Sequence, residues 1–340
     1  MFSVEKVVRT ICLFVRELNE QSFAKLEEIE TILKNAQFLI QTKRVCVPGP
    51  LSLVDDRQCR ENGILLGKGV CSLKDWYLWE NLFLQTENTY LTLDMTHEDL
   101  NEQYVDLLFR IIQKRAEHTF RLSYGSHIPD SSPYFPSAHF AKEGFSIGLQ
   151  STNLSAACAS LEEWLERMKA VWEEVHVLLS PVEGYLGIDG SVSPLFDGVS
   201  SLVHFVKREH SSFQESVTSS WYTKLSHFLR TENSRPVGFS GLMFPCLEDF
   251  ELAAEYEQGQ FSIERNLFLS LHSGLGIDTY PIGIDEDRAK VLEIFRLVQA
   301  LSCKYGKPLS VRFVSDGKTM IGERSLFQNS YLKDVCIRPL

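Results

Sequence analysis

The sequence predicts an α/β protein in which helices cover a parallel β-sheet. Short β-branched apolar runs alternate with amphipathic stretches along the whole 340 residues. No low-complexity tract and no repeat of fixed period interrupts this alternation. Consecutive strand, helix, strand units are typical of parallel crossover connections. The sheet is therefore expected to be either open and doubly wound or closed into a barrel.

Composition and charge narrow the classes of function. Apolar residues make up 44% and charged residues 23%, as in ordinary globular proteins. The net charge of −11 argues against nucleic acid as a partner, because phosphate backbones are bound mainly by Lys and Arg. Glu5, Lys6 and Arg9 interrupt the first apolar run, so neither a signal peptide nor a membrane span is predicted.

The spacing of the cysteines bears on metal and redox motifs and on the cellular compartment. The eight cysteines include no C-x-x-C pair, which argues against zinc-ribbon and thioredoxin-like motifs. We expect a cytoplasmic protein whose thiols are reduced and mostly buried.

The first predicted elements are a strand, a helix and a second strand. Val7–Val15 (VVRTICLFV) is a β-branched apolar run and predicts a buried strand. Apolar residues of Phe23–Phe38 recur at intervals of three and four, which predicts an amphipathic helix. Leu39–Val47 predicts a second strand, which Pro48 ends. The next elements are predicted to be a helix at Leu73–Leu84, a strand at Thr89–Leu93, a helix at Glu98–Glu117 and a strand at Thr119–Ser123.

A loop rich in Pro, Ser and Gly is predicted at Gly125–Gly144. Long loops inside regular domains are typically functional or act as lids. His139 lies in this loop and is a candidate proton shuttle or metal ligand, the alternative being an exposed polar residue.

The second half of the chain continues the alternation within one domain spanning residues 1–340. The strongest helix is predicted at Leu154–Leu179, and a polar, serine-rich linker at His210–Ser220 is expected to be mobile. The other predicted helices are Phe196–Arg208, Trp221–Thr231, Leu247–Glu257, Ser262–Ser273 and Arg288–Tyr305. The other predicted strands are Tyr185–Asp189, Val237–Met243, Asp278–Ile282 and Pro308–Val314.

Carboxylates after glycine-rich turns are the main candidates for chemistry. The turns lie at Gly238–Gly241 and Gly274–Gly276, where backbone can approach a ligand closely. Carboxylates at strand ends can act as general acids or bases or bind a hard cation. The structural alternatives are helix capping for Glu248 and Asp249 and turn stabilisation for Asp189 and Asp278. The candidate catalytic residues are Asp189, Glu248, Asp278 and His139, and the candidate ligands of a divalent cation are Asp189, Asp249 and Asp278.

Two arginines lie inside apolar strands, where an unpaired guanidinium is costly. If Arg44 and Arg312 face a barrel lumen, they are expected to pair with carboxylates or to bind an anionic substrate. Ser191 and Ser240 are further candidates for substrate binding. The sequence around Ser240 lacks the glycine spacing of a nucleophile elbow, which argues against a serine hydrolase.

Seven groups of segments occur in a fixed order along the chain: VRTICLFV, QTKRVCV, YFPSAHF with GFSIGLQSTNL, YLGIDGSVSP, GFSGLMFPCLEDFELA, SGLGIDTYPIG and KPLSVRFV. Together they resemble the domain-of-unknown-function 711 family over nearly the full length. The resemblance implies a ten-stranded α/β barrel similar to pyruvate formate-lyase, with two parallel half-sheets of five strands that lie antiparallel to each other. It does not bring glycyl-radical chemistry, since the C-terminal SYLKDVCIRPL has no glycine and Cys246 is not paired with a second cysteine.

Two functions from different classes follow from these observations. The first is an enzyme-like site for a small molecule at the barrel mouth, using polar acid–base or metal-assisted chemistry. The second is a non-catalytic binding or assembly protein on an enzyme-like scaffold. Its homo-oligomer contact would lie near Leu154–Leu179 or the Trp221 helix.

Overall fold

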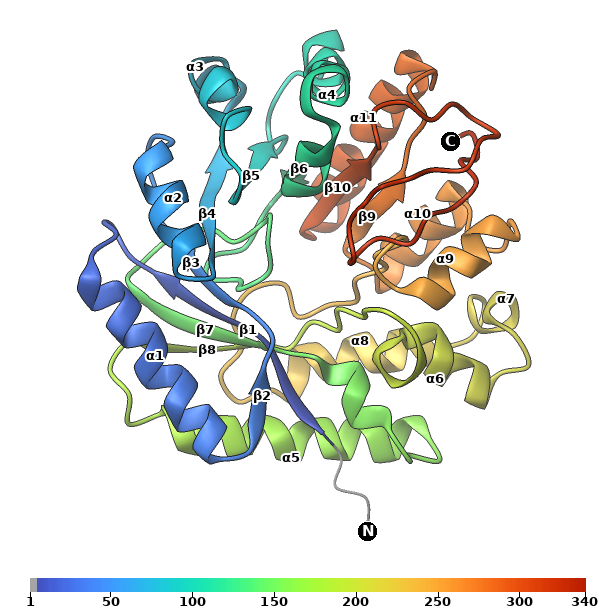
Figure 1. Ribbon diagram of the computed structural model, residues 1–340. Coiled ribbons are helices and arrows are strands. Elements are labelled where there is room, and N and C mark those ends of the chain that lie inside the picture. Colours follow the sequence, from blue (N-terminus) through green and yellow to red (C-terminus); the bar gives the residue numbers. More distant parts are fainter. Residues whose placement is uncertain (1–4) are drawn as a thin grey trace.

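The computed structural model describes residues 5–340, with the helices on the outside and the strands inside them (Figure 1). The strands are β1 (Lys6–Phe14), β2 (Phe38–Ile40), β3 (Lys43–Cys46), β4 (Ile64–Cys71), β5 (Thr89–Asp94), β6 (Leu122–Ser126), β7 (Gly144–Leu149), β8 (Tyr185–Asp189), β9 (Gly276–Pro281) and β10 (Leu309–Val314). The mixed α/β class and the alternation of strands and helices are therefore confirmed.

Polar side chains cap the N-termini of most of the helices. Asn19 and Ser22 form a capping box on α1, and Gly306 ends α11 in the left-handed region at φ 56°. The helices are α1 (Glu20–Asn35), α2 (Leu53–Glu61), α3 (Leu73–Phe83), α4 (Glu102–Arg115), α5 (Leu161–Leu179), α6 (Leu202–Glu209), α7 (Phe213–Ser216), α8 (Trp221–Thr231), α9 (Phe250–Glu257), α10 (Ile263–His272) and α11 (Arg288–Tyr305). Three short 3₁₀ segments are η1 (Ala116–Arg121), η2 (Ser151–Ser155) and η3 (Gly198–Ser200).

The sheet consists of two parallel sets of strands that meet antiparallel. Its order is β8-β7-β1-β3-β4-β5-β6-β10-β9, and β2 pairs with β1 off this path. The strands β1, β3, β4, β5 and β6 are parallel and form what we call the first half-sheet. The second half-sheet holds the parallel pairs β7–β8 and β9–β10. Antiparallel pairs β1–β7 and β6–β10 join the two half-sheets.

The predicted strand at Val237–Met243 forms isolated bridges instead of a continuous ladder. Leu242 bridges to both Val192 and Gly274, and Pro245 bridges to Asp278, all in the parallel sense. Two causes prevent a ladder. Pro236 and Pro245 lack an N–H, and the amides of Phe239 and Ser240 donate to the Asp189 carboxylate. This segment, residues 236–249, therefore lies between the β8 side and the β9 side of the second half-sheet.

Other differences from the predicted elements have local causes. No element is predicted for residues 51–72, which contain α2 and β4. Gly67, Lys68 and Gly69 within β4 interrupt the apolar pattern of a strand. The helix predicted from Leu154 begins at Leu161, after η2, and the helix predicted from Phe196 begins at Leu202. The predicted linker contains α7, whose Phe213 is buried.

The predicted loop after β6 runs into the interior. Residues 131–138 are all buried, and β7 begins at its end. Phe135 and Ala138 pack against Cys12, Phe14 and Cys46. The alternate residues of β1 and β3, among them Ile11 and Val45, join the main core with α1 instead. The helices therefore cover one face of the sheet, and this interior loop (residues 127–143) covers the other.

Candidate functional site

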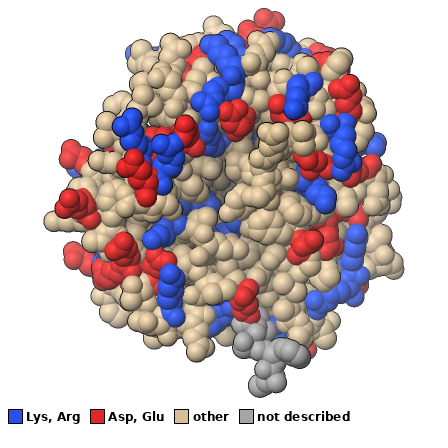
Figure 2. Space-filling view, in the orientation of Figure 1, with Lys and Arg blue, Asp and Glu red and all other residues tan. Residues whose placement is uncertain are grey.

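A cavity of about 360 Å³ opens where the two half-sheets meet the interior loop. The first half-sheet contributes Arg44, Leu65 and Tyr90, each the second residue of its strand. The second half-sheet contributes Asp278 and Arg312 from within β9 and β10. The two half-sheets run antiparallel. The beginnings of strands in the first half-sheet therefore lie at the same cavity mouth as residues further along the strands of the second half-sheet. Figure 2 shows a central hollow on one face, with atoms of basic side chains visible inside it.

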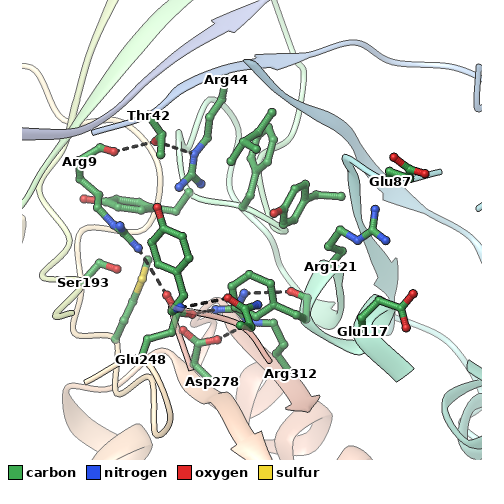
Figure 3. Close-up of a pocket in the computed structure, with 18 residues that line it drawn as sticks. Arg9, Thr42, Arg44, Glu87, Glu117, Arg121, Ser193, Glu248, Asp278 and Arg312 are labelled. Atoms are coloured by element: carbon green, nitrogen blue, oxygen red, sulfur yellow. Dashed lines mark hydrogen bonds and ion pairs between the residues drawn. The ribbon is translucent and has the colours of Figure 1, made fainter. Parts of the chain in front are cut away.

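Four buried arginines distinguish this cavity, which we call the arginine cavity. Arg9 comes from β1, Arg44 from β3, Arg121 from the end of η1 and Arg312 from β10. Figure 3 shows their side chains converging on the same space from different elements. Four cationic groups so close together repel one another unless anions lie between them.

Two carboxylates neutralise one side of the cavity. Arg312 donates from Nε to Asp278 Oδ1 at 2.7 Å and from Nη2 to Glu248 Oε1 at 2.6 Å. Arg9 Nη2 lies 3.4 Å from Glu248 Oε2. Burial raises the pKa of Glu248 above its ordinary value, and the Arg312 guanidinium opposes that shift. Glu248 is thus a buried carboxylate whose proton affinity depends on how its arginines are occupied.

Arg44 makes no ion pair within residues 5–340. Its Nε donates to Thr42 Oγ1 at 3.2 Å and its Nη1 to the Pro133 carbonyl at 3.3 Å. Its guanidinium lies 4.9 Å from the centre of the Phe135 ring. Burial, followed by repulsion from Arg9, lowers the pKa of Arg44 to about 10. Arg44 is therefore a cation held by neutral groups only.

Arg121 is likewise without a carboxylate partner in the described chain. Its Nη2 lies 3.0 Å from His118 Nδ1, and its Nη1 is buried without any hydrogen-bond partner. The Nε of Arg9 is also buried and unpartnered. Buried donors without acceptors are costly, and these N–H groups are therefore available to an acceptor that enters the cavity.

The remaining acidic residues around the cavity belong to its exposed rim. The side chains of Glu87 and Glu117 are 55% and 58% exposed and pair with Arg60 and Arg115. The buried part of the cavity thus holds four arginines against two carboxylates. This cationic excess lies inside a protein whose net charge is −11.

Aromatic side chains form much of the wall. Phe120, Tyr90 and Phe135 line the first half-sheet side, and Tyr134 extends from the interior loop. The Tyr134 hydroxyl donates to the carbonyls of Leu149 and Ser191, each at 3.2 Å, so its proton is already engaged. The segment after β10 contributes Asn329 and Tyr331, and Tyr331 stacks on Phe196 with ring centres 5.7 Å apart. The wall therefore suits a ligand that has a flat or apolar part beside its negative charge.

The structure places four predicted site residues together, namely Arg44, Glu248, Asp278 and Arg312. Two predicted carboxylates have structural roles instead. Asp189 accepts five hydrogen bonds, from Ser132 Oγ, Ser191 N and Oγ, Phe239 N and Ser240 N. Asp249 caps α9 through the amides of Glu251 and Leu252 and also accepts from Leu202 N at the start of α6. Burial raises the pKa of Asp249 to about 6.

The other predicted residues lie outside the arginine cavity. Ser191 bonds to Asp189 as described, and Ser240 lines a different cavity. His139 accepts a hydrogen bond from Val70 N at 3.4 Å and lies 3.9 Å from Asp130. Residues 5–340 contain no group of three or more His, Cys, Asp or Glu arranged to hold a metal ion. The three aspartates expected to bind a cation, Asp189, Asp249 and Asp278, are thus not gathered in one cluster.

Two arginines of the cavity, Arg9 and Arg121, are not among the site residues predicted from the sequence. Arg9 lies in the apolar run VVRTICLFV, so it carries the same signal that identified Arg44 and Arg312. Arg121 precedes β6 in a 3₁₀ segment, where no periodicity marks it.

Comparison with known proteins agrees with the resemblance seen in the sequence. No curated protein matches the chain. No helix within residues 5–340 combines the length and the apolar character needed to cross a membrane. A family profile described as uncharacterised ACR (DUF711) matches residues 85–328, which is more than half of the chain. The chain therefore belongs to the DUF711 family.

Proposed function

We propose that the protein binds a small anionic molecule in the arginine cavity and acts on it by acid–base chemistry. The observation that carries this proposal is the pair Arg44 and Arg121, two buried cations without a carboxylate partner in the described chain. Guanidinium groups recognise carboxylates and phosphates through paired hydrogen bonds. A volume of about 360 Å³ suits a small metabolite.

A closed barrel would explain how both half-sheets come to line one cavity. We propose that residues 236–249 act as a fifth strand of the second half-sheet and close the sheet into a barrel. The bridges of Leu242 to Val192 and to Gly274 support this closure. Two antiparallel sets of five strands would then match the pyruvate formate-lyase-like architecture, without its radical chemistry.

Glu248 is the proposed general acid or base. It lies among Arg9, Arg312 and Asp278, and burial already raises its pKa. An anion that binds Arg9 or Arg312 competes for the cations that hold Glu248 ionised. Ligand binding would therefore raise the proton affinity of Glu248. The protonated carboxyl group could then donate its proton to the ligand as a general acid.

The alternative proposal is a non-catalytic binding or assembly protein that uses the same cavity. The structural roles of Asp189 and Asp249 favour it, because they remove two carboxylates from the candidate chemistry. Both proposals predict ligand binding, but only the first predicts turnover that Glu248→Gln abolishes. A homo-oligomer formed through α5 or α8 belongs to the second proposal, and sedimentation measurements would detect it.

The binding step is tested by thermal shift and titration calorimetry with mono- and dicarboxylates and phosphate esters. We expect at least one ligand to bind the wild type and to lose about tenfold or more in affinity in Arg44→Gln and Arg121→Gln. Arg57→Gln is the matched control, because Arg57 is exposed on α2 and lies outside the cavity. Equal binding by the arginine variants and wild type, or no binding of any anion, would reject the proposal.

A further inference from the structure

A second cavity is lined by residues of both predicted glycine-rich turns. Its volume is about 290 Å³. The first turn contributes Ser240 and Gly241, and the second contributes Leu275, with Ser273 directly before that turn at the end of α10. The ends of α8 and α11 complete it with Arg230 and with the residues around Lys307. The two turns that the sequence singled out for ligand approach therefore share a cavity that the proposed function does not use.

This cavity is separate from the arginine cavity. A void of only about 40 Å³ lies between them. The void shares Phe239 and Leu275 with the second cavity, and it shares Asp278 and Arg312 with the arginine cavity. So small a void has room for a few water molecules at most, so we treat the two cavities as separate sites.

The lining of the second cavity is basic and hydroxyl-rich. Its charged or titratable groups are Arg230, Lys307 and His272, with the phenol of Tyr305, and no Asp or Glu of the described chain lines it. Lys307 is half-buried, and its Nζ donates only to the Ser270 carbonyl, at 2.8 Å. Arg230 is exposed and makes neither an ion pair nor a side-chain hydrogen bond within residues 5–340. Burial, followed by repulsion from Arg230, lowers the pKa of Lys307 to about 8.

The hydroxyls add donors beside these cations. Ser240 Oγ is buried and has no hydrogen-bond partner, although Ser240 is held at φ 45° in a region that favours glycine. Ser273 Oγ lies 2.8 Å from His272 Nδ1 and 3.2 Å from Ser226 Oγ. The cavity thus brings together two cations without carboxylate partners and an unsatisfied buried hydroxyl.

We infer that this second cavity is a binding site for a phosphate or carboxylate group. An oxyanion would accept hydrogen bonds from Lys307, Arg230 and Ser240 together, and it would balance a positive charge that no carboxylate in the cavity balances. The inference does not depend on the proposed function, because it uses none of the residues of the arginine cavity.

Inorganic phosphate is the probe, and acetate distinguishes a phosphate site from a carboxylate site. Binding is followed by the thermal shift of the wild type, with sodium chloride at matched ionic strength as the reference for general screening. We expect one of the two anions to stabilise the protein and its apparent affinity to fall about tenfold or more in Lys307→Met and in Arg230→Gln. The control Lys224→Met, an exposed lysine of α8 outside the cavity, is expected to behave as wild type.

Two further variants keep the test decisive. Ser240→Gly removes the hydroxyl while suiting the positive φ, so it is expected to fold and to bind the anion more weakly. Arg44→Gln weakens anion binding in the arginine cavity. This variant is expected to keep the thermal stabilisation by phosphate or acetate that Lys307→Met loses. The inference is overturned if neither anion stabilises the wild type beyond chloride, or if Lys307→Met and Arg230→Gln respond like the wild type. It is also overturned if Arg44→Gln alone removes the response.

Discussion

At the scale of single residues, His118 holds Arg121 in place for the cavity. The His118 ring is fully buried, with Nε2 at 3.1 Å from the Phe83 carbonyl and 3.0 Å from the Thr86 carbonyl. Carbonyl oxygens only accept, so Nε2 carries the proton and Nδ1 accepts from Arg121. This geometry requires a neutral imidazole. Burial, followed by the Arg121 charge, lowers the pKa of His118 to about 4.

This pKa predicts a loss of stability in mild acid. The folded pKa lies below the unfolded value of about 6.5, so the unfolded chain takes up the proton first as the pH falls. Between pH 7 and pH 5 the free energy of unfolding is expected to drop by on the order of 2 kcal/mol because of His118. Urea unfolding of His118→Gln, which can keep both types of hydrogen bond, should show a flatter pH dependence. The exposed His227→Gln should keep the wild-type slope, and equal slopes in all three proteins would contradict this role.

At the scale of elements, the interior loop depends on glycines in the strands around it. A Cβ at Gly67 of β4 would lie 2.7 Å from the Phe135 ring, and one at Gly148 of β7 would lie 2.8 Å from the Tyr134 ring. Gly67 has no positive φ, so the reason for glycine there is space and not backbone conformation. The strands thus leave room for the aromatic residues that form the cavity wall.

We expect Gly67→Ala to destabilise the protein by about 1–3 kcal/mol through overpacking against Phe135. Phe135→Leu removes the ring atoms in question, so the Gly67→Ala change should cost less in the Phe135→Leu background. A double-mutant cycle of unfolding free energies measures this coupling. Strictly additive effects would show that the loop does not pack against β4 as described.

At the scale of the whole molecule, the accessibility of the cysteines to a thiol reagent shows which parts of the chain are closed to solvent. Cys303 is exposed and Cys336 is half-buried, whereas the other six cysteines are buried. Burial raises the pKa of Cys246 well above its ordinary value, which keeps it a thiol. A thiol reagent is therefore expected to modify two cysteines of the native protein quickly and all eight only after unfolding. Cys303→Ser with Cys336→Ser should abolish the fast reaction, and a fast reaction at Cys246 would contradict the enclosed interior.

The distribution of charge is also a property of the whole molecule. The net charge of −11 argues against nucleic acid as a partner, but it does not reveal a basic cavity inside an acidic protein. Strand arginines pointed to such a cavity, because a guanidinium within an apolar strand requires a special environment. Arg44 and Arg312 were predicted on that ground and line the cavity, and Arg9 satisfied the same criterion. The cytoplasmic location stays a prediction.

The sequence by itself determined the α/β class, most of the helices and the strands with continuous β-branched runs, because these depend on local periodicity. It also indicated which carboxylates and arginines to consider. Only the tertiary structure decided which of them meet. Asp189 and Asp278 each follow a Gly-Ile pair, yet one bonds to backbone amides and the other pairs with Arg312. That difference arises from the segments that the fold places beside each carboxylate: the amides of Phe239 and Ser240 lie beside Asp189, whereas β10 places Arg312 beside Asp278. Such contacts between distant segments leave no periodic signal in the chain.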